Sequence, residues 1–472
     1  MPELHTIEVF FLWLFLVYML ATTIIYLLLN GIAFSTLVDY MEMKRDDDDE
    51  LMLVGIEPPI SILIPAYNEA ATIVTSIRSL LQLYYPEYEL IVINDGSRDD
   101  TLDVLIREFD LVPFPQAYNK QLNTRQVNQV YYSLERDNIR VIDKENGGKA
   151  DALNVGLNVS RYPLFCCVDA DSILERNTLI RAVQPFIDDP HVIACGGTVR
   201  IANGCTVRDG HLVSKGIPKN LLALFQLVEY LRGFLYGRIG WARLDALLII
   251  SGAFGIMRKD RVIEVGGYNP QTVGEDMELI VRLHRKLSKA EIPYRIAFIP
   301  DPICWTEAPE SMRVFSSQRV RWHRGLSESL WLNRELLLAR NSGLSGWLAF
   351  PFFVLFEWLS PFVELAGYIF TLYLALTGKI VPEIALIFFI FAVLLSVLLS
   401  TVALLLDEIT FKGIDKLRYL PVIFAYSFFE CFGYRQINAW FRIKGAVKWL
   451  TGSKADWGKM VRTGSWQKNK SN

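Results

Sequence analysis

The chain has 472 residues, 52% of them apolar, and its formal net charge at pH 7 is −3. That length exceeds one typical hydrophobic core, so at least two structural units are expected, and the long apolar runs make a membrane protein the first hypothesis. No strongly basic stripe is present, which argues against a nucleic-acid partner.

The six cysteines, at positions 166, 167, 195, 205, 304 and 431, form no C-x-x-C pair and do not cluster with the five histidines. They are typical of small apolar residues in a reducing compartment. The sequence therefore predicts neither a disulfide framework nor a zinc site.

The first predicted element is a membrane-spanning helix from Val9 to about Phe34, a nearly uncharged run that exceeds the roughly 20 residues a crossing needs. A cleaved signal peptide is the alternative, but no Lys or Arg precedes the run and its apolar part is too long. The first basic residues, Lys44 and Arg45, follow the run, so the positive-inside rule places the next part of the chain in the cytosol.

From about residue 58 to residue 340 the pattern is that of an α/β domain. The runs "ISILIPAYNE", "ELIVINDGS", "IRVIDK" and "PLFCCVDAD" predict strands, and "AATIVTSIRSLLQL" and "KADALNVGLNVS" predict helices between them. This alternation predicts a mostly parallel, doubly wound sheet, in which ligands lie beyond the carboxyl ends of the strands. The polar stretch 113–131 interrupts the pattern and is predicted to be a surface insertion.

Three further apolar segments follow, at about 347–376, 384–406 and 420–441, and then a basic tail that should be cytosolic. An even number of crossings must join a cytosolic domain to a cytosolic tail, so we predict that 420–441 is interfacial or re-entrant.

Glu357 and Glu364 lie seven residues apart on one helix face; they could line a polymer channel, but an ion pair with Arg435 is favoured. The predicted parts are 1–45, 46–325, 326–441 and 442–472.

Asp169 and Asp171 end the apolar strand "PLFCCV", and on an extended chain their side chains point the same way. Two carboxylates so placed repel each other unless a cation lies between them, which predicts a divalent metal with oxygen ligands. The alternative is a capping box, because Ser172 and Glu175 have the S-x-x-E spacing that starts a helix.

Three other polar clusters fall at predicted strand ends on the same edge. They are the loop from Pro65 through Tyr67 to Glu69, the turn at Asp95, and the helix entry "NGGKAD", which carries Lys149 and Asp151. Each has an ordinary explanation as a turn or a helix start. Their convergence predicts a pocket for a nucleoside diphosphate and a metal.

These clusters resemble the donor half of family-2 glycosyltransferases. Farther along, "ISGAFGIMRKD" and "VGEDMEL" resemble the acceptor half, and "QRVRW", Gln318 to Trp322, matches the Q-x-x-R-W motif of processive members. With its apolar segments, the chain is similar to integral-membrane β-polysaccharide synthases of the poly-N-acetylglucosamine, hyaluronan and cellulose type. The tail motif "WGKMVR", residues 457–462, resembles a gating loop of the hyaluronan synthases.

The resemblance implies a fold and a reaction. The fold would be a GT-A-like nucleotide-diphospho-sugar transferase domain, with a mostly parallel sheet, inserted between transmembrane helices. The reaction would be processive, inverting polymerisation of a β-linked exopolysaccharide from a UDP-sugar, coupled to export, with an accessory subunit as a possible partner. The protein would be multi-pass, in a bacterial inner membrane with its catalytic domain in the cytosol. The alternatives are single addition to a lipid-linked acceptor and a non-catalytic scaffold.

The resemblance also implies roles for individual residues. Asp95, Asp151 and the Pro65–Glu69 loop would bind the nucleoside, and Lys149 the phosphates. Asp169 and Asp171 would hold Mg²⁺ or Mn²⁺.

The remaining roles concern the transfer step. Asp276 would be the general base, and Arg321, with Arg319 as the alternative, would stabilise the leaving diphosphate. Gln318 belongs to the same motif. Trp322 would stack on the terminal sugar of the growing chain, although a tryptophan at a membrane interface is the equally ordinary explanation.

Overall fold

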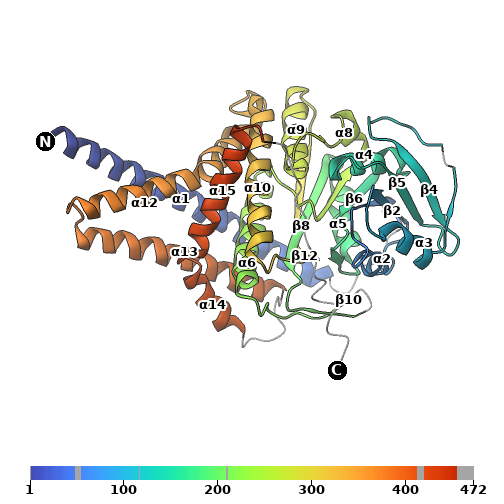
Figure 1. The fold of residues 1–472 in the computed structure, drawn as a ribbon, viewed down its shortest axis with the longest axis horizontal. Coiled ribbons are helices and arrows are strands. Elements are labelled where there is room, and N and C mark those ends of the chain that lie inside the picture. The colour runs from blue at the N-terminus through green and yellow to red at the C-terminus, as the bar shows by residue number, and fades with distance from the viewer. Residues whose placement is uncertain (1, 48–54, 116, 209–210, 412–418, 454–472) are drawn as a thin grey trace.

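The computed structural model describes residues 2–47, 55–115, 117–208, 211–411 and 419–453. A sheet domain occupies one end of the molecule, and α1 (Pro2–Asp47), α12 (Ser360–Leu376) and α13 (Pro382–Phe411) extend from it at the other end (Figure 1). The tail motif at 457–462 lies outside the described residues.

In the part of the chain that the structure describes, the main sheet has ten strands. Across the sheet they are β3 (Leu111–Pro113), β4 (Val127–Ser133), β5 (Ile139–Lys144), β2 (Tyr88–Asp95), β1 (Ile60–Ala66), β6 (Leu164–Val168), β11 (Phe254–Arg258), β8 (Val192–Ile201), β12 (Arg295–Thr306) and β7 (Ile173–Leu174). A separate hairpin pairs β9 (Thr206–Arg208) with β10 (His211–Ser214).

The predicted α/β class and the four predicted strands are confirmed, but the sheet is mixed and not mostly parallel. The central block β5, β2, β1 and β6 is parallel, as the β-α-β alternation requires. Strand β11 lies between β6 and β8 and runs antiparallel to both. It does so because the helices that precede it return the chain to the carboxyl ends of those two strands. Part of the predicted insertion also joins the sheet, as β4 runs antiparallel to β5.

Helices cover both faces of the sheet, as the alternation of strand residues dictates. Leu63, Ile93 and Phe165 pack in one apolar core with α4 (Lys149–Val159) and α9 (Glu275–Lys289). The intervening residues, such as Ile62 and Cys166, pack in another core with helices from the opposite layer. Those helices are α2 (Ile73–Leu80), α3 (Thr101–Glu108) and α5 (Thr178–Asp188), while α8 (Lys259–Glu264) lies beside α9.

A second group of helices joins the sheet domain to the long apolar helices. It consists of α6 (Leu221–Leu231), the π-helix η1 (Arg232–Arg238), α7 (Ile239–Arg243), α10 (Met312–Leu332), the 3₁₀ turn η2 (Arg334–Leu336), the π-helix η3 (Ser345–Ala349), α11 (Phe350–Phe352), the π-helix η4 (Phe353–Trp358), α14 (Leu420–Phe429) and α15 (Tyr434–Leu450). Helix α10 lies along α15 and also contacts α9 (Figure 1).

One described helix segment, Glu8–Glu42, is long and apolar enough to cross a bilayer by itself. The pair Ser345–Trp358 and Ser360–Leu376 passes the same criterion only if its 41° bend belongs to a single span. The apolar segment 420–441 is two helices, and α14, with ten residues, is too short to cross. The insertion of the sheet domain between several transmembrane helices therefore stays a prediction.

The two acidic residues singled out from the sequence, Glu357 and Glu364, have polar partners. Glu364 Oε1 lies 4.0 Å from Arg435 Nε, which is the ion pair that the sequence favours. Glu357 instead accepts from the Tyr26 hydroxyl over 2.8 Å and lies 3.5 Å from the guanidinium of Arg442. The contacts with Arg435 and Arg442 tie α15 to the bent helix pair, and the contact with Tyr26 ties α1 to it.

Candidate functional site

Asp95 and Lys144 occupy matching positions at the carboxyl ends of the neighbouring parallel strands β2 and β5. Lys144 is fully buried. Its ammonium pairs with the carboxylate of Asp95 and lies 2.8 Å from Asp151 Oδ1. One buried cation therefore serves two of the predicted binding residues.

Asp95 also holds the turn that precedes α4. It accepts hydrogen bonds from the backbone N–H of Gly147 over 2.9 Å and of Gly148 over 2.7 Å, and from Asn146 Nδ2 over 3.1 Å. Gly96 makes the close approach possible, since its φ is +65° and a Cβ there would lie 2.8 Å from Asn146 N. Asp95 thus anchors the entry to α4, and its contact with a nucleoside stays a prediction.

The Pro65–Glu69 loop lies against the turn that follows Asp95. The backbone N–H of Asn68 donates to Ser97 Oγ over 3.0 Å, and Asn68 Oδ1 accepts from Arg98 N over 2.8 Å. Tyr67 extends from this loop with 44% of its surface exposed. The structure therefore brings the two predicted nucleoside-binding loops together.

Asp169 and Asp171 follow β6 directly, and the capping-box alternative is wrong. Helix α5 begins at Thr178 with Asn177 as its N-cap, whereas the residues after Ser172 form the short strand β7. Asp171 is 2% exposed, while the Asp169 side chain retains 27% exposure. The two aspartates are therefore available for a role other than starting a helix.

Lys149 connects the predicted donor and acceptor halves. Its Nζ lies 2.6 Å from Asp169 Oδ1, 3.1 Å from the carbonyl oxygen of Gly252 and 3.6 Å from Glu275 Oε1. Burial alone would lower the pKa of Lys149, but the carboxylates of Asp169, Glu275 and Asp276 outweigh that cost and raise it. The lysine is a permanent cation between three acids.

Asp276 lies in the first turn of α9, as the helix-start explanation requires, and its role as the general base stays a prediction. Its Oδ2 accepts from the backbone N–H of Gly252 over 2.9 Å, and its Oδ1 accepts from Met277 N over 2.8 Å. A Cβ on Gly252 would lie 3.0 Å from Lys149 Nζ and 3.1 Å from Asp276 Oδ2, so only glycine leaves this space open. The "ISGAFG" motif therefore lies against the predicted base.

Glu275, which precedes the predicted base, is almost fully buried. Burial raises the pKa of its carboxyl to about 7, an effect that Lys149 opposes and Asp276 reinforces. Arg321 also lowers the pKa of Glu275, which places the predicted leaving-group cation within electrostatic reach of this acid.

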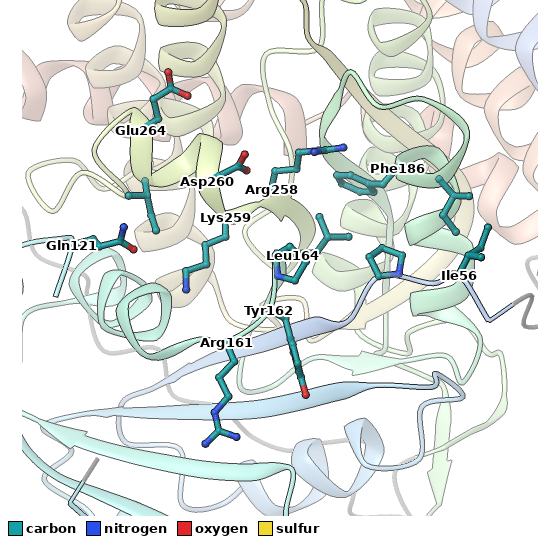
Figure 2. A pocket seen from close by; sticks show the side chains of 14 residues that line it. Ile56, Gln121, Arg161, Tyr162, Leu164, Phe186, Arg258, Lys259, Asp260 and Glu264 are labelled. Atoms are coloured by element: carbon teal, nitrogen blue, oxygen red, sulfur yellow. The ribbon is translucent and has the colours of Figure 1, made fainter. Parts of the chain in front are cut away.

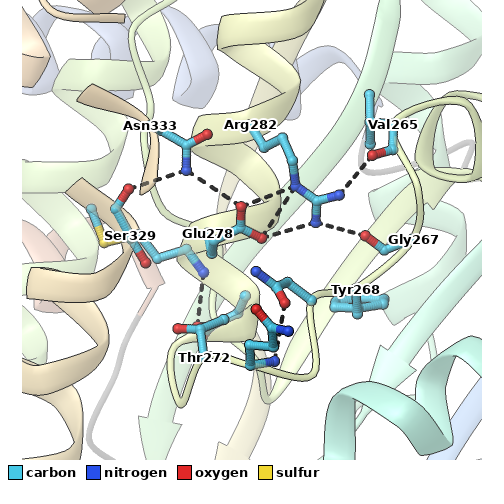
Figure 3. Close-up of polar contacts among 12 residues, drawn as sticks. Val265, Gly267, Tyr268, Thr272, Glu278, Arg282, Ser329 and Asn333 are labelled. Carbon is cyan, nitrogen blue, oxygen red and sulfur yellow. Dashed lines mark hydrogen bonds and ion pairs between the residues drawn. The ribbon is translucent and has the colours of Figure 1, made fainter. Parts of the chain in front are cut away.

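A buried hydrogen-bond network joins helix α9 to the loop that precedes it and to the end of α10 (Figure 3). Arg282 pairs with Glu278 over 2.9 Å and donates to the carbonyl oxygens of Val265 over 2.7 Å and Gly267 over 2.6 Å. Asn333, just after α10, donates to Glu278 Oε1 over 3.4 Å. These contacts hold the helix that carries Asp276.

The "QRVRW" motif lies on α10, which packs against the start of α9 at two glycines. A Cβ on Gly325 would lie only 2.8 Å from Gly274 Cα. Trp322 is 42% exposed, whereas Gln318 is 7% exposed. The close approach brings the helix that carries the motif against the N-terminal end of α9, where Asp276 lies.

Arg319 is 4% exposed and its guanidinium binds both carboxylate oxygens of Glu229, over 2.5 and 2.9 Å. It also lies over the Trp322 ring, 4.6 Å from the centroid. Arg319 therefore supports the tryptophan, and its predicted contact with substrate stays a prediction.

The comparison with protein families matches two parts of the chain. Residues 61–114 match "Glycosyl transferase family 2", and residues 164–404 match "Glycosyl transferase family group 2". The chain belongs to glycosyltransferase family 2. The second match alone contains Asp169 and Asp171, which follow β6, together with Asp276 on α9 and the "QRVRW" motif on α10.

Curated relatives of this family member include the poly-β-1,6-N-acetyl-D-glucosamine synthases of Staphylococcus epidermidis and of Staphylococcus aureus strain COL. The first is 28% identical over 62% of this chain and 61% of its own length, and the second is 29% identical over 63% and 60%. The matches thus span about three-fifths of these relatives.

A solved structure shares the fold at low sequence identity. It is the mannosyltransferase PcManGT of Pyrobaculum calidifontis in complex with GDP-Man and Mn²⁺, with a TM-score of 0.51, 17% identity, and coverage of 92% of this chain and all of that one. The GT-A-like nucleotide-sugar transferase fold is therefore present in this chain.

Four residues at the site of this family member were not selected from the sequence. Lys144 ends the strand "IRVIDK", so the argument from strand ends would have found it. Glu275 adjoins Asp276. Tyr230 and Arg238 lie in the apolar stretch "LLALFQLVEYLRGFLYGRIGW". The charge of Arg238 in such a stretch is a signal that could have found it, whereas Tyr230 gives none.

Two hollows lie near the sheet. One of about 610 Å³ lies beside the site and is lined by Arg125, Asn146 to Gly148, Asp151 and Thr272, among others. The larger one, about 1000 Å³, lies at the opposite end of β6, where Arg161, Tyr162 and Lys259 surround it (Figure 2). Ligands of such sheets bind beyond the carboxyl ends of the strands, which identifies the smaller hollow as part of the site.

Proposed function

We propose that this chain is a membrane-bound, inverting glycosyltransferase that adds sugars processively from a UDP-sugar to a β-linked polysaccharide, with UDP-N-acetylglucosamine as the first donor to test. Its similarity to the poly-β-1,6-N-acetyl-D-glucosamine synthases supports this choice of sugar. The family assignment supports the reaction class.

The observation that carries the proposal is the convergence of acidic groups from separate elements around Lys149. Asp169 comes from the end of β6, whereas Glu275 and Asp276 come from the start of α9. A transferase needs these groups close together, because the groups that bind the donor diphosphate and the acceptor hydroxyl must act on the same anomeric carbon.

In the proposed step, Asp276 takes the proton of an acceptor hydroxyl as the oxygen bonds to the anomeric carbon. The bond from that carbon to the diphosphate breaks, and UDP leaves with its electrons. Backbone N–H groups of Gly252 and Met277 orient the carboxylate. A carboxylate has about four acceptor sites, so sites remain for the hydroxyl proton. Single displacement on an α-linked donor gives a β-linkage.

A divalent cation is part of the proposal. Carboxylates are the ligands that Mg²⁺ and Mn²⁺ prefer, and Asp169 and Asp171 supply them. Among the described residues, no group of three His, Cys, Asp or Glu side chains can hold a metal alone, so diphosphate oxygens and water would complete the shell. When bound, the ion would neutralise charge on the leaving diphosphate.

The apolar helices support attachment to a membrane. On α1, α12 and α13, large apolar side chains are exposed, among them Phe10, Trp13, Leu372 and Leu394. Exposed apolar surface on this scale fits a lipid environment better than water. Export of the polymer and an accessory subunit are further elements of the proposal.

The test is turnover by purified protein reconstituted in lipid. We expect UDP release from UDP-N-acetylglucosamine with Mg²⁺ or Mn²⁺, and a product of many sugars. Single-sugar products would favour transfer to a lipid-linked acceptor instead.

Two variants control this test. Asp276→Asn should abolish UDP release while retaining UDP binding, because the amide cannot take the proton. Asp260→Asn, an exposed aspartate at the remote hollow, should behave as wild type. Full activity of Asp276→Asn would refute the assignment of the base.

A further inference from the structure

Arg238 is the last residue of η1, a helix that the proposed mechanism does not yet use. The Asp276 carboxylate is close enough to act on it: burial lowers the pKa of Arg238 to about 10, and Asp276 opposes that shift. Arg238 is therefore a cation at neutral pH, within electrostatic reach of the proposed base.

The guanidinium of Arg238 is fixed in place by an aromatic ring. Its Cζ lies 3.7 Å above the centroid of Phe234, one helical turn earlier, and Phe234 itself is 8% exposed. A guanidinium stacked on a ring is held in one plane, so its N–H groups point in fixed directions. Irregular π-helical turns such as η1 often occur at functional sites.

One donor of this guanidinium has no protein acceptor. Arg238 Nη1 is buried, and within the described ranges of the chain no hydrogen-bond partner lies within reach. Buried donors are normally satisfied, and a functional site is a common reason for an exception. A substrate oxygen would complete the set.

A row of aromatic rings leads from Arg238 to Trp322. The centroids of Phe234 and Tyr230 are 5.4 Å apart, and those of Tyr230 and Trp322 are 6.4 Å apart. The charges of Arg238 and Asp171 both act on Tyr230, so its hydroxyl lies within electrostatic reach of each. Aromatic faces suit the apolar side of a pyranose, which makes this wall suitable for the acceptor sugar.

We propose that Arg238 binds the attacking hydroxyl of the acceptor sugar, donating from Nη1 to its oxygen and so directing its proton to Asp276. The chemistry of the two groups is complementary: a guanidinium only donates and a carboxylate only accepts. A hydroxyl between them has one possible orientation. The positive charge also favours the negative charge that develops on the oxygen as its proton leaves.

The donor side of the site is served by a different cation. Lys149 contacts Asp169, whereas no contact between Lys149 and Arg238 is found among the described residues. Loss of Arg238 should therefore weaken the use of acceptor and leave nucleotide binding intact. This inference rests on the proposed glycosyltransferase activity.

The test compares Arg238→Met and Arg238→Lys with wild type in lipid, varying UDP-N-acetylglucosamine and a short β-1,6-linked N-acetylglucosamine oligosaccharide in turn. For Arg238→Met we expect kcat/KM for the oligosaccharide to fall about 10- to 100-fold, as for loss of a charge-assisted hydrogen bond. UDP affinity should change less than about twofold, and Arg238→Lys should recover part of the activity. Arg243→Met, an exposed arginine on α7, is the matched control.

The outcomes separate the two levels of the proposal. If wild type releases no UDP from any UDP-sugar, the proposed function fails. If wild type is active and Arg238→Met keeps its kcat/KM for the oligosaccharide, or loses UDP affinity instead, the role of Arg238 is refuted. If Arg238→Met does not fold, Phe234→Leu decides: it removes the ring beneath the guanidinium and should raise the KM for the oligosaccharide alone.

Discussion

Replacing Lys144 with methionine tests whether one buried cation holds the nucleoside side of the site together. The lysine is fully buried between Asp95 and Asp151, whose side chains are only 4% and 8% exposed. Methionine keeps the approximate length of the side chain and removes the charge. Two buried carboxylates then lose their shared partner.

The magnitude follows from what each carboxylate retains. Removing one partner of a buried ion pair costs about 3–5 kcal/mol. Asp95 keeps the backbone N–H groups of Gly147 and Gly148, and Asp151 keeps that of Arg125, which argues for the lower end, about 3 kcal/mol. At about 2 °C per kcal/mol for a domain of this size, the melting temperature should fall by about 6 °C.

The assay is thermal unfolding in detergent, followed by tryptophan fluorescence, with Lys120→Met as an exposed control. Adding Asp151→Asn to Lys144→Met should recover part of the stability. A melting temperature for Lys144→Met within about 1 °C of the control would refute the reasoning, since it corresponds to under 1 kcal/mol.

Three other variants test the remaining parts of the site. Burial raises the pKa of Glu275 from 4.5 to about 7, so the stability contributed by this carboxyl is present below about pH 4.5 and is lost as the pH rises through 7. The free energy of unfolding of Glu275→Gln, measured by denaturant unfolding, should therefore rise relative to that of wild type across this pH range, by up to about 3 kcal/mol. For the exposed control Glu135→Gln, the difference from wild type should not change with pH. Gly325→Val should destabilise the protein by about 1–3 kcal/mol by forcing α10 away from Gly274; unchanged unfolding would contradict the close packing. Asp171→Asn should abolish turnover and weaken Mn²⁺ binding in the presence of UDP by about tenfold or more, measured by electron paramagnetic resonance, and unchanged Mn²⁺ affinity would remove this residue from the metal site.

The central sheet could be predicted because its signals are local. The apolar runs that became β1, β2, β5 and β6 each end in polar residues, and a parallel arrangement follows from the helices between them. The antiparallel strand β11 was not predicted, since its direction depends on where the preceding helices return the chain. The direction is set by tertiary packing, and no repeating pattern in the sequence encodes it.

The residues of the site also fall into two groups, those that local sequence signals predict and those that only tertiary packing brings to the site. Asp95, Asp151, Asp169 and the Pro65–Glu69 loop follow strands, so the carboxyl edge of the sheet gathers them. Arg238 lies in an apolar helix far from any strand end, and only the packing of η1 brings it to the site. No local pattern records that packing.

The arrangement also explains how so many carboxylates can gather at one edge of the sheet. Like charges within a few ångströms destabilise a fold unless each has its own compensation. Asp95 and Asp151 share Lys144, Asp169 and Glu275 share Lys149, and Asp276 has two backbone N–H groups. Under the proposed function, a sugar nucleotide would bring further negative charge to this edge. Lys149, whose side chain keeps 16% exposure, is a cation that this charge could reach, whereas Lys144 is fully buried. The substrate diphosphate would then meet positive charge that the protein has already placed.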